Sequence, residues 1–346
     1  MIPDKLRVAF LGCGTITRTQ HLPAALAHPA IEIVALVDSD ATRAEALARA
    51  SGIRCSVSSD YCVTTKVADA VVNALPNSLH APVTLELLRE GKHVLCEKPL
   101  AITAADARAC AELATEKGLV LAVGMNRRFD ASHRLLHCVL QDGQIGKVNS
   151  YEWQYGSEFE WRSVSAFYFS RDLAGGGVLM DFGVHLLDSL ISWFGPVTAV
   201  DYQDDDWGGG IEANCILALQ HEGEHGSVRG RIQASRTVTL RNRLLIEGTD
   251  AKAEIRVGDP DTLLLHRSVG GVPVIDDLHF ADEAGKSSFY KQLDNFVKSI
   301  SEKQRPEVDA WQALRTIEVI ERCYAHRRRL SEPWSEVNTT VNTARA

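Results

Sequence analysis

The sequence predicts an α/β fold of two domains, and three observations support this prediction. Short apolar segments alternate with helix-like segments over residues 6–123, which is typical of a doubly wound sheet of parallel strands. From residue 148 onward, several segments show the alternation expected of half-buried strands. The chain has 346 residues, which is enough for two globular cores.

The first domain is predicted over residues 1–124, as strands separated by helices. Apolar runs predict its strands at 6–11, 31–37, 70–75, 93–96 and 119–123. Helices are predicted up to residue 26 and at 41–50, 81–90 and 103–117. Each strand is therefore followed by a helix, as in a series of βαβ units.

The second domain is predicted over residues 125–332, before a polar tail at 333–346. Its strand-like segments are 148–155, 213–220, 226–234, 243–247 and 253–257. A turn signal, Glu247-Gly248-Thr249-Asp250, separates the last two segments. A helix entered through Gly175-Gly176-Gly177 is also predicted.

Charge and cysteine usage exclude several classes of protein. The net charge of −8 gives no positive field for a nucleic-acid backbone, so we expect a small metabolite as partner and no nucleic acid. No uninterrupted apolar run approaches the roughly 20 residues needed to cross a bilayer, so we expect a cytoplasmic protein without membrane contact. The eight cysteines form no C-x-x-C pair, which favours reduced core thiols over disulfides or a zinc site.

A glycine-rich turn, Gly12-Cys13-Gly14-Thr15-Ile16-Thr17, follows the first predicted strand. It matches the first two glycines of the G-x-G-x-x-G pattern, and Thr17 stands in place of the third. Gly12 allows a sharp turn, and Gly14 allows a pyrophosphate to approach the backbone N–H groups at the start of the helix. Gly12, Gly14, Thr15 and Ile16 are therefore predicted to bind a dinucleotide in a Rossmann domain.

Asp38 ends the second predicted strand, where an acidic residue binds the ribose 2′-hydroxyl of NAD. Because a carboxylate repels a 2′-phosphate, NAD is predicted, with NADP as the alternative since Ser39 and Arg43 lie nearby. The competing interpretation of Asp38 is an N-cap for the helix at 41–50.

Three further motifs occur in a characteristic order. They are Pro76-Asn77-x-x-His80, then Glu97-Lys98-Pro99, and then Gly175-Gly176-Gly177-x-x-x-Asp181-x-Gly183-x-His185. Together these motifs resemble the glucose–fructose oxidoreductase / inositol dehydrogenase family, usually written Gfo/Idh/MocA.

The resemblance implies a fold and an assembly. In this family a Rossmann domain is followed by an α/β domain with a large, open, mostly antiparallel sheet, which commonly forms the subunit interface. A sheet with one uncovered face usually acquires a partner. We therefore expect a homodimer or a homotetramer.

Hydride transfer between an alcohol carbon and nicotinamide needs a group that exchanges the hydroxyl proton. Lys98, Asp181 and His185 are the predicted catalytic residues. Lys98 follows a parallel strand, at the edge where ligands bind in such sheets, and desolvation beside an oxidised nicotinamide favours proton exchange near neutral pH. The alternative for Lys98 is a surface pair with Glu97.

Asp181 and His185 are spaced i, i+4 on the helix that follows the glycines, so they share one face. By resemblance, His185 acts with Lys98 as acid and base, while Asp181 orients substrate hydroxyls. His185 could instead be a core residue, and a metal site at this pair is not predicted because no third ligand appears at helical spacing.

The resemblance also assigns cofactor and substrate contacts. The further cofactor contacts are Leu75, Pro76, Asn77, His80, Glu97, Lys98 and Asn126. The substrate contacts are Lys98, Asn126, Tyr155, Trp161, Arg162, Asp181 and His185. Tyr290 is a weaker candidate for the cofactor, and Arg127 and Arg128 fit ion pairs equally well.

The function predicted from these residues is NAD(P)-dependent oxidation or reduction at a ring hydroxyl or ketone of a sugar, cyclitol or sugar nucleotide. Two alternatives remain open. One is an enzyme that retains its cofactor and produces no net redox change, such as an epimerase or a glycoside-processing enzyme. The other is a sensor of NAD(H) without turnover, although a sensor has no need of a proton-transfer set.

Overall fold

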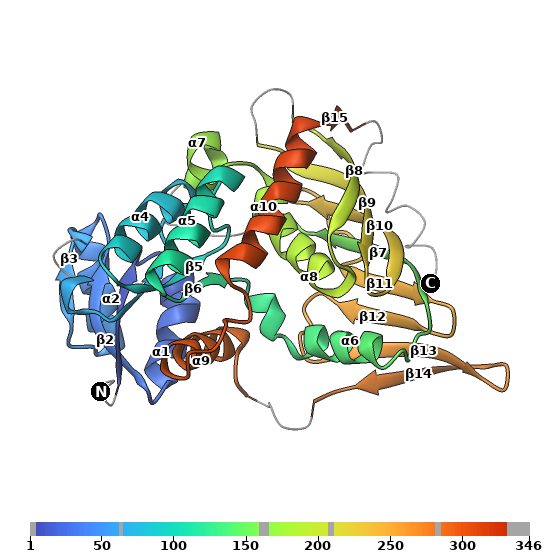
Figure 1. Cartoon of the computed structure of the whole chain (residues 1–346), viewed down its shortest axis with the longest axis horizontal. Coiled ribbons are helices and arrows are strands. Elements are labelled where there is room, and N and C mark those ends of the chain that lie inside the picture. The colour runs from blue at the N-terminus through green and yellow to red at the C-terminus, as the bar shows by residue number, and fades with distance from the viewer. Residues whose placement is uncertain (1–4, 62–64, 159–165, 207–210, 281–284, 331–346) are drawn as a thin grey trace, which may run out of the picture. The chain divides into compact units, whose positions relative to one another are not determined.

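The computed structural model describes residues 5–61, 65–158, 166–206, 211–280 and 285–330 (Figure 1). The chain divides into two compact units, neither of which is a single stretch of sequence. The first comprises Met1–Phe129, Arg162–Gly175 and Ala284–Glu318, and the second comprises Asp130–Trp161, Gly176–Glu283 and Val319–Ala346. The first unit thus includes segment 284–318, which lies far from 1–124 in sequence. The limits at 124 and 332 stay predictions.

The first unit contains a six-stranded sheet in the order β3-β2-β1-β4-β5-β6, and every neighbouring pair is parallel. The strands are β1 (Leu6–Leu11), β2 (Ile31–Val37), β3 (Ser56–Ser58), β4 (Ala70–Asn73), β5 (His93–Glu97) and β6 (Leu121–Gly124). The strand order reverses between β1 and β4. Ligands of doubly wound sheets bind at the carboxyl ends of strands beside such a reversal.

Helices pack on this sheet, and the first four named here also connect its strands (Figure 1). They are α1 (Leu22–Ala27), α2 (Ala41–Ser51), α4 (Asn77–Arg89), α5 (Ala104–Lys117) and, from late in the chain, α9 (Ser288–Ser301). Phe296 of α9 joins Leu22 of α1 and Phe10 of β1 in one buried apolar cluster. Helix α4 begins at Asn77 and not at the predicted residue 81, because Pro76 occupies its N-cap position and starts the helix earlier.

The second unit contains a nine-stranded sheet in the order β14-β13-β12-β11-β7-β10-β9-β8-β15. The strands are β7 (Val148–Gly156), β8 (Val197–Asp204), β9 (Asn214–Gly223), β10 (Gly226–Ser235), β11 (Arg243–Gly248), β12 (Lys252–Arg256), β13 (Leu263–Val269), β14 (Val272–Leu278) and β15 (Arg328–Arg329). Only β7–β10 and β8–β15 pair in parallel, and the other pairs are antiparallel. The predicted fold class, with its mostly antiparallel second sheet, is confirmed.

Two helices of the second unit, α6 (Ala131–Gln141) and α8 (Val184–Phe194), pack against each other and on the sheet. The rings of His133 on α6 and Trp193 on α8 lie 4.3 Å apart, and Trp193 stacks on Trp153 of β7. The α8 helix is buried along most of its length, which fixes the residues at its start.

One stretch of the described residues, Arg171–Phe194, is long and apolar enough to cross a membrane by length and composition alone. Within its most apolar window, 89% of the residues are buried inside the structure, as in a core helix. The sequence prediction missed this stretch because glycines, Asp181 and Asp188 interrupt its apolar residues.

Candidate functional site

The glycine-rich turn joins β1 to the first helix and lies against the loop after β4. Gly12 has a φ of +90°, and a Cβ placed on it would lie 2.4 Å from the carbonyl oxygen of Ala74. No side chain fits there, so glycine is required by both the backbone and the neighbouring loop. The turn therefore presents bare backbone at the sheet's strand-order reversal, as dinucleotide binding requires.

Thr17 explains why the third glycine of the pattern is dispensable. Its buried hydroxyl donates to the carbonyl oxygen of Gly12 over 2.6 Å, closing the turn with a side chain. The segment Thr17–His21 is one π-helical turn, with Ile16 as its N-cap. Such turns are frequent at functional sites.

Asp38 lies beside this turn at the end of β2. Its Oδ2 accepts from the Cys13 N–H over 2.8 Å, and its Oδ1 accepts from Arg43 over 2.7 Å and from the Asp40 N–H over 3.0 Å. Asp40, whose side chain accepts from the Thr42 N–H, is the N-cap of α2, so the N-cap interpretation of Asp38 is wrong. Because each carboxylate oxygen has two lone pairs, Oδ2 retains one for a ribose hydroxyl among its described contacts.

His80 links the loops that follow β4 and β5. Its Nδ1 lies 2.6 Å from the carbonyl oxygen of Pro99, and its Nε2 lies 2.7 Å from that of Leu75. Asn77, at the start of α4, donates to the carbonyl oxygen of Ala174 over 2.9 Å. Leu75, Asn77 and His80 thus shape the loop after β4, and Pro76 begins α4 beside them.

Glu97 ends β5 and forms a buried pair with His21 of the π-helical turn. The His21 Nε2 and Glu97 Oε1 atoms lie 2.6 Å apart, and Glu97 Oε2 accepts from the Lys98 N–H over 3.1 Å. Burial alone raises the pKa of Glu97, but the hydrogen bond and charge of His21, with the charges of Lys98 and His80, outweigh it and lower that pKa. Sequence reasoning assigned no role to His21, because its pairing with Glu97 forms only in the folded chain.

Lys98 directly follows β5, and the Lys98–Pro99 peptide bond is cis. Its backbone N–H donates to the Glu97 carboxylate. Lys98 therefore contacts Glu97 at least through its main chain. Asn126, after β6, donates to the Ser288 hydroxyl at the start of α9 over 3.3 Å. Tyr290, two residues further, lies against His28, with ring centroids 5.3 Å apart.

In the second unit, Asp181 and His185 follow the glycine turn, on a π-helical turn (Leu179–Gly183) and on α8. Both residues are 9% exposed. Asp181 accepts from Arg236, just after β10, over 2.8 Å. Sequence reasoning missed Arg236, because no local pattern links it to a helix 55 residues earlier.

The aromatic residues predicted to contact substrate fall in two groups. Tyr155 of β7 packs edge-on against Phe182, with ring centroids 4.8 Å apart, and the Arg236 guanidinium lies over the Phe182 ring, 5.8 Å from its centroid. Because Phe182 directly follows Asp181 in the chain, Tyr155 lies close to Asp181. Trp161 and Arg162 lie outside the described residues.

The structure thus gathers the predicted residues into two sets. Gly12, Gly14, Thr15, Ile16, Asp38 and the loops around Leu75, Lys98 and Asn126 belong to the first unit, and Tyr155, Asp181 and His185 belong to the second. Within the ranges that the structure describes, no group of three His, Cys, Asp or Glu side chains could hold a metal ion.

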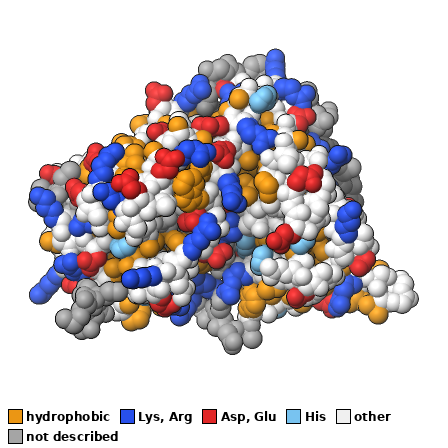
Figure 2. All heavy atoms as spheres, viewed as in Figure 1, with side chains coloured by type: hydrophobic (Ala, Val, Ile, Leu, Met, Phe, Trp, Pro, Cys, Tyr) orange, Lys and Arg blue, Asp and Glu red, His pale blue; other side chains and the backbone are white. Residues whose placement is uncertain are grey.

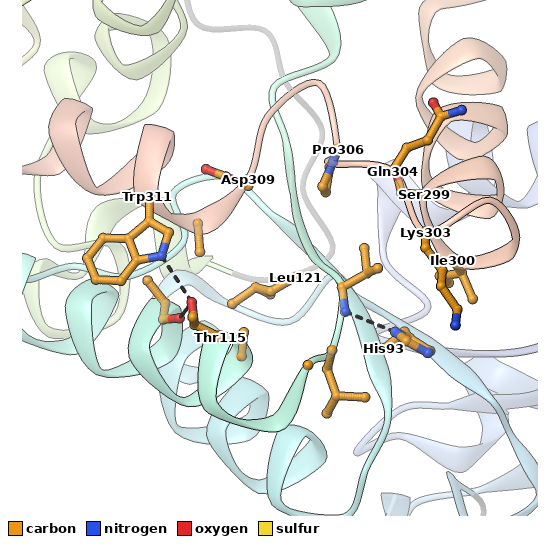
Figure 3. Close-up of a pocket in the computed structure, with 16 residues that line it drawn as sticks. His93, Thr115, Leu121, Ser299, Ile300, Lys303, Gln304, Pro306, Asp309 and Trp311 are labelled. Atoms are coloured by element: carbon orange, nitrogen blue, oxygen red, sulfur yellow. Dashed lines mark hydrogen bonds between the residues drawn. The ribbon is translucent and has the colours of Figure 1, made fainter.

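A pocket in the first unit lies at the opposite edge of the parallel sheet, near the amino ends of β5 and β6 (Figure 3). Trp311 donates to Thr115 on one side of it, and the Val120 N–H donates to His93 on the other. None of the predicted site residues lines this pocket. On the molecular face drawn in Figure 2, positive and negative side chains are interspersed.

Two family profiles match the chain and decide its family. The oxidoreductase family profile with an NAD-binding Rossmann fold matches residues 6–125, and the GFO/IDH/MocA C-terminal domain profile matches residues 133–254. The chain belongs to the Gfo/Idh/MocA oxidoreductase family. The resemblance seen in its motifs and the predicted NAD(P)-binding Rossmann domain are confirmed.

The names of several proteins similar to this Gfo/Idh/MocA chain describe enzymes that act on sugars. The 1,5-anhydro-D-fructose reductase of Ensifer adhaerens is 35% identical over 185 residues, which span 53% of this chain and only 55% of that protein. The fold matches levoglucosan dehydrogenase in complex with NADH and L-sorbose, with a TM-score of 0.85 and 20% identity over 93% of this chain and 96% of that one. It also matches an Actinomadura kijaniata 3-ketoreductase in complex with NADP and TDP-benzene, with a TM-score of 0.81 and 22% identity over 95% and 100% of the two chains.

Proposed function

We propose that this Gfo/Idh/MocA protein is an NAD(P)-dependent dehydrogenase or reductase. It transfers a hydride between nicotinamide and a ring hydroxyl or ketone of a sugar, cyclitol or sugar nucleotide. The observation that carries the proposal is the Glu97-Lys98-Pro99 segment at the carboxyl end of β5, which His21 and His80 hold at the same end of the parallel sheet as the bare backbone of Gly12. The sugar-directed names of the relatives support the substrate class.

The residues of the first unit fit a dinucleotide. Gly12 leaves room at the turn for close approach of a pyrophosphate, and Asp38 offers a carboxylate oxygen to a ribose hydroxyl. Gly14, Thr15, Ile16, Leu75, Pro76, Asn77, His80, Glu97 and Asn126 complete the proposed cofactor contacts. When bound, nicotinamide supplies the hydride acceptor or donor.

The proton-transfer groups are Lys98 and His185 in this proposal. When an alcohol is oxidised, its carbon gives up a hydride and its hydroxyl proton passes to Lys98 or His185, and reduction reverses both transfers. Asp181, which is paired with Arg236, accepts hydrogen bonds from substrate hydroxyls. Tyr155, Trp161, Arg162 and Asn126 are the other proposed substrate contacts. The homo-oligomeric state and the cytoplasmic location stay predictions.

The test is reduced-nicotinamide absorbance with NAD or NADP and a panel of sugars, cyclitols, glycosides and sugar nucleotides, including 1,5-anhydro-D-fructose and levoglucosan. Lys98→Met and His185→Asn should each lower kcat by at least about a hundredfold, the scale of lost acid–base catalysis. Both variants should still bind NADH by fluorescence.

A wild-type signal that survives Lys98→Met and His185→Asn would overturn the assigned roles. If no substrate changes the absorbance but mass analysis finds altered sugars, the enzyme retains its cofactor. Cofactor binding without any altered sugar would favour the sensor.

A further inference from the structure

A buried glutamate outside all the sequence motifs accepts hydrogen bonds from the start of the helix that carries Asp181 and His185. Glu212, which is 0% exposed, accepts from the Gly177 N–H at Oε2 over 3.0 Å and from the Leu179 N–H at Oε1 over 2.9 Å. Its main-chain carbonyl oxygen accepts from the Val178 N–H over 2.8 Å. The first N–H groups of a helix have no acceptor within the helix, and here one distant residue accepts three in succession.

The glycines of the turn are explained by the same contact. A Cβ on Gly177 would lie 1.9 Å from the Glu212 carbonyl oxygen, and a Cβ on Gly176 would lie 2.1 Å from the Tyr324 hydroxyl oxygen. Both distances are far below any real contact, so Gly177, which faces the Glu212 backbone, accepts only glycine, and a side chain at 176 would have to displace Tyr324. Glu212 and Tyr324 thus fill the space that side chains at 176 and 177 would need.

A second layer holds Glu212 itself. Tyr324 of α10 (Ala310–Ala325) donates to Glu212 Oε1 over 2.9 Å, and an Arg327 nitrogen lies 3.9 Å from Oε2. Arg327 also pairs with Asp204 over 2.8 Å and with Asp206, and its guanidinium lies 5.1 Å from the Tyr324 ring. All these residues belong to the second unit.

All the close donors around Glu212 use its carboxyl oxygens as acceptors. Two backbone N–H groups and one hydroxyl donate to these oxygens, and each oxygen has lone pairs enough for the donors that it receives. Burial raises the pKa of Glu212 above its ordinary value, although the N–H groups of Leu179 and Gly177, with the Tyr324 hydroxyl, oppose the rise.

We propose that Glu212 is a positioning residue for the reaction. It fixes where the π-helical turn Leu179–Gly183 begins, and so fixes the rotation of Asp181 and His185 about the helix axis. This inference rests on the proposed function of those two residues. Because reaction rates fall steeply when catalytic groups shift by about 1 Å, loss of this anchor should lower kcat about ten- to a hundredfold.

The test compares Glu212→Gln with Tyr324→Phe. The glutamine keeps the size of Glu212 but turns an NH₂ donor toward one of the two N–H groups, whereas the phenylalanine leaves both N–H bonds in place. We expect Glu212→Gln to lower kcat about ten- to a hundredfold with the NADH dissociation constant within about twofold of wild type, because the cofactor binds the first unit. Tyr324→Phe should lower kcat less than about threefold.

Hydrogen–deuterium exchange of peptides covering residues 177–188 gives a readout that needs no substrate. In Glu212→Gln, exchange should rise in these peptides while those of β9 and β10 stay as protected as in wild type. If the glutamine variant does not fold, Glu212→Asp takes its place, because it keeps the carboxyl group but is too short to reach both N–H groups.

Unchanged kcat and unchanged exchange in a folded Glu212 variant, with His185→Asn inactive, would overturn this inference and leave the proposed function standing. Locally raised exchange in a protein whose wild type is inactive on every sugar would sustain the anchoring role of Glu212 and refute the proposed function.

Discussion

At the scale of single residues, we propose that the pair of Asp38 and Arg43 determines the preference between NAD and NADP. A carboxylate favours the free ribose hydroxyl of NAD, whereas the guanidinium beside it suits the 2′-phosphate of NADP. The N–H of Cys13 depends on the same carboxylate, so the substitution must keep an acceptor there. Asparagine removes the charge and keeps one oxygen.

We expect Asp38→Asn to raise the ratio of kcat/KM for NADP to that for NAD about tenfold, because it removes repulsion of the phosphate and releases Arg43. Arg43→Ala should change the ratio in the opposite direction. Initial rates with both cofactors measure it. A ratio that Asp38→Asn leaves unchanged would show that Asp38 serves only to fix the Cys13 turn.

The buried pair of Glu97 and His21 predicts a dependence of stability on pH. Because the pKa of Glu97 is lowered in the folded protein, its ionisation contributes stability above the ordinary pKa of a glutamate, and that contribution is lost as the pH falls through the folded pKa. Glu97→Gln should therefore cost about 1–3 kcal/mol of unfolding free energy near neutral pH, and the difference from wild type should shrink in acid.

Urea unfolding of wild type and Glu97→Gln at a series of pH values measures this difference. A difference that stays constant into acid, or that grows as the pH falls, would rule out an ionised Glu97 as the stabilising form.

At the scale of elements, the turn after β1 depends on the absence of a side chain at Gly12. Gly12→Ala places a Cβ 2.4 Å from the Ala74 carbonyl oxygen and forces an alanine to a φ of +90°. The loops after β1 and β4 must then separate, so we expect NADH affinity to fall at least about tenfold.

Gly118→Ala is the matched control for Gly12→Ala. Gly118 also has a positive φ, of +63°, but a Cβ there meets no atom within 4 Å. It should cost about 1 kcal/mol of stability and leave NADH affinity unchanged. Fluorescence titration with NADH compares the two variants, and equal affinities would contradict the role of the close approach.

Sequence reasoning found the elements more fully than the site. Apolar periodicity placed β1 at 6–11 and β2 at 31–37 as the structure has them, because buried parallel strands have little other freedom. It missed His21, Arg236 and Glu212, whose partners lie 76, 55 and 35 residues away. Such pairings arise only when the sheets form, so no local pattern reveals them.

At the scale of the whole molecule, the β13–β14 hairpin carries exposed apolar side chains. Val269, Val272 and Ile275 are 59%, 61% and 58% exposed. Strand β14 ends the nine-stranded sheet, and apolar residues exposed at a sheet edge favour association with another copy. We therefore predict a homodimer or homotetramer by light scattering, weakened when Val272 and Ile275 are both changed to Lys.

Leu26→Lys is the control for that double variant, since Leu26 is 51% exposed on α1 of the first unit. It should leave the mass of the assembly unchanged. A wild-type monomer would refute the predicted assembly, and an assembly insensitive to the double variant would place the interface elsewhere.

In the proposed reaction a hydride passes between nicotinamide and a sugar carbon, with Lys98 as a proton-transfer group. The most direct measurement supplies NADH or NADPH with deuterium at the transferred position, together with keto sugars from the panel, and follows the label by mass spectrometry. We expect deuterium bonded to the ring carbon of the product alcohol, at a rate that Lys98→Met lowers at least about a hundredfold. Reduced sugar without deuterium would refute direct hydride transfer, and label transfer that Lys98→Met leaves unchanged would refute the role of Lys98.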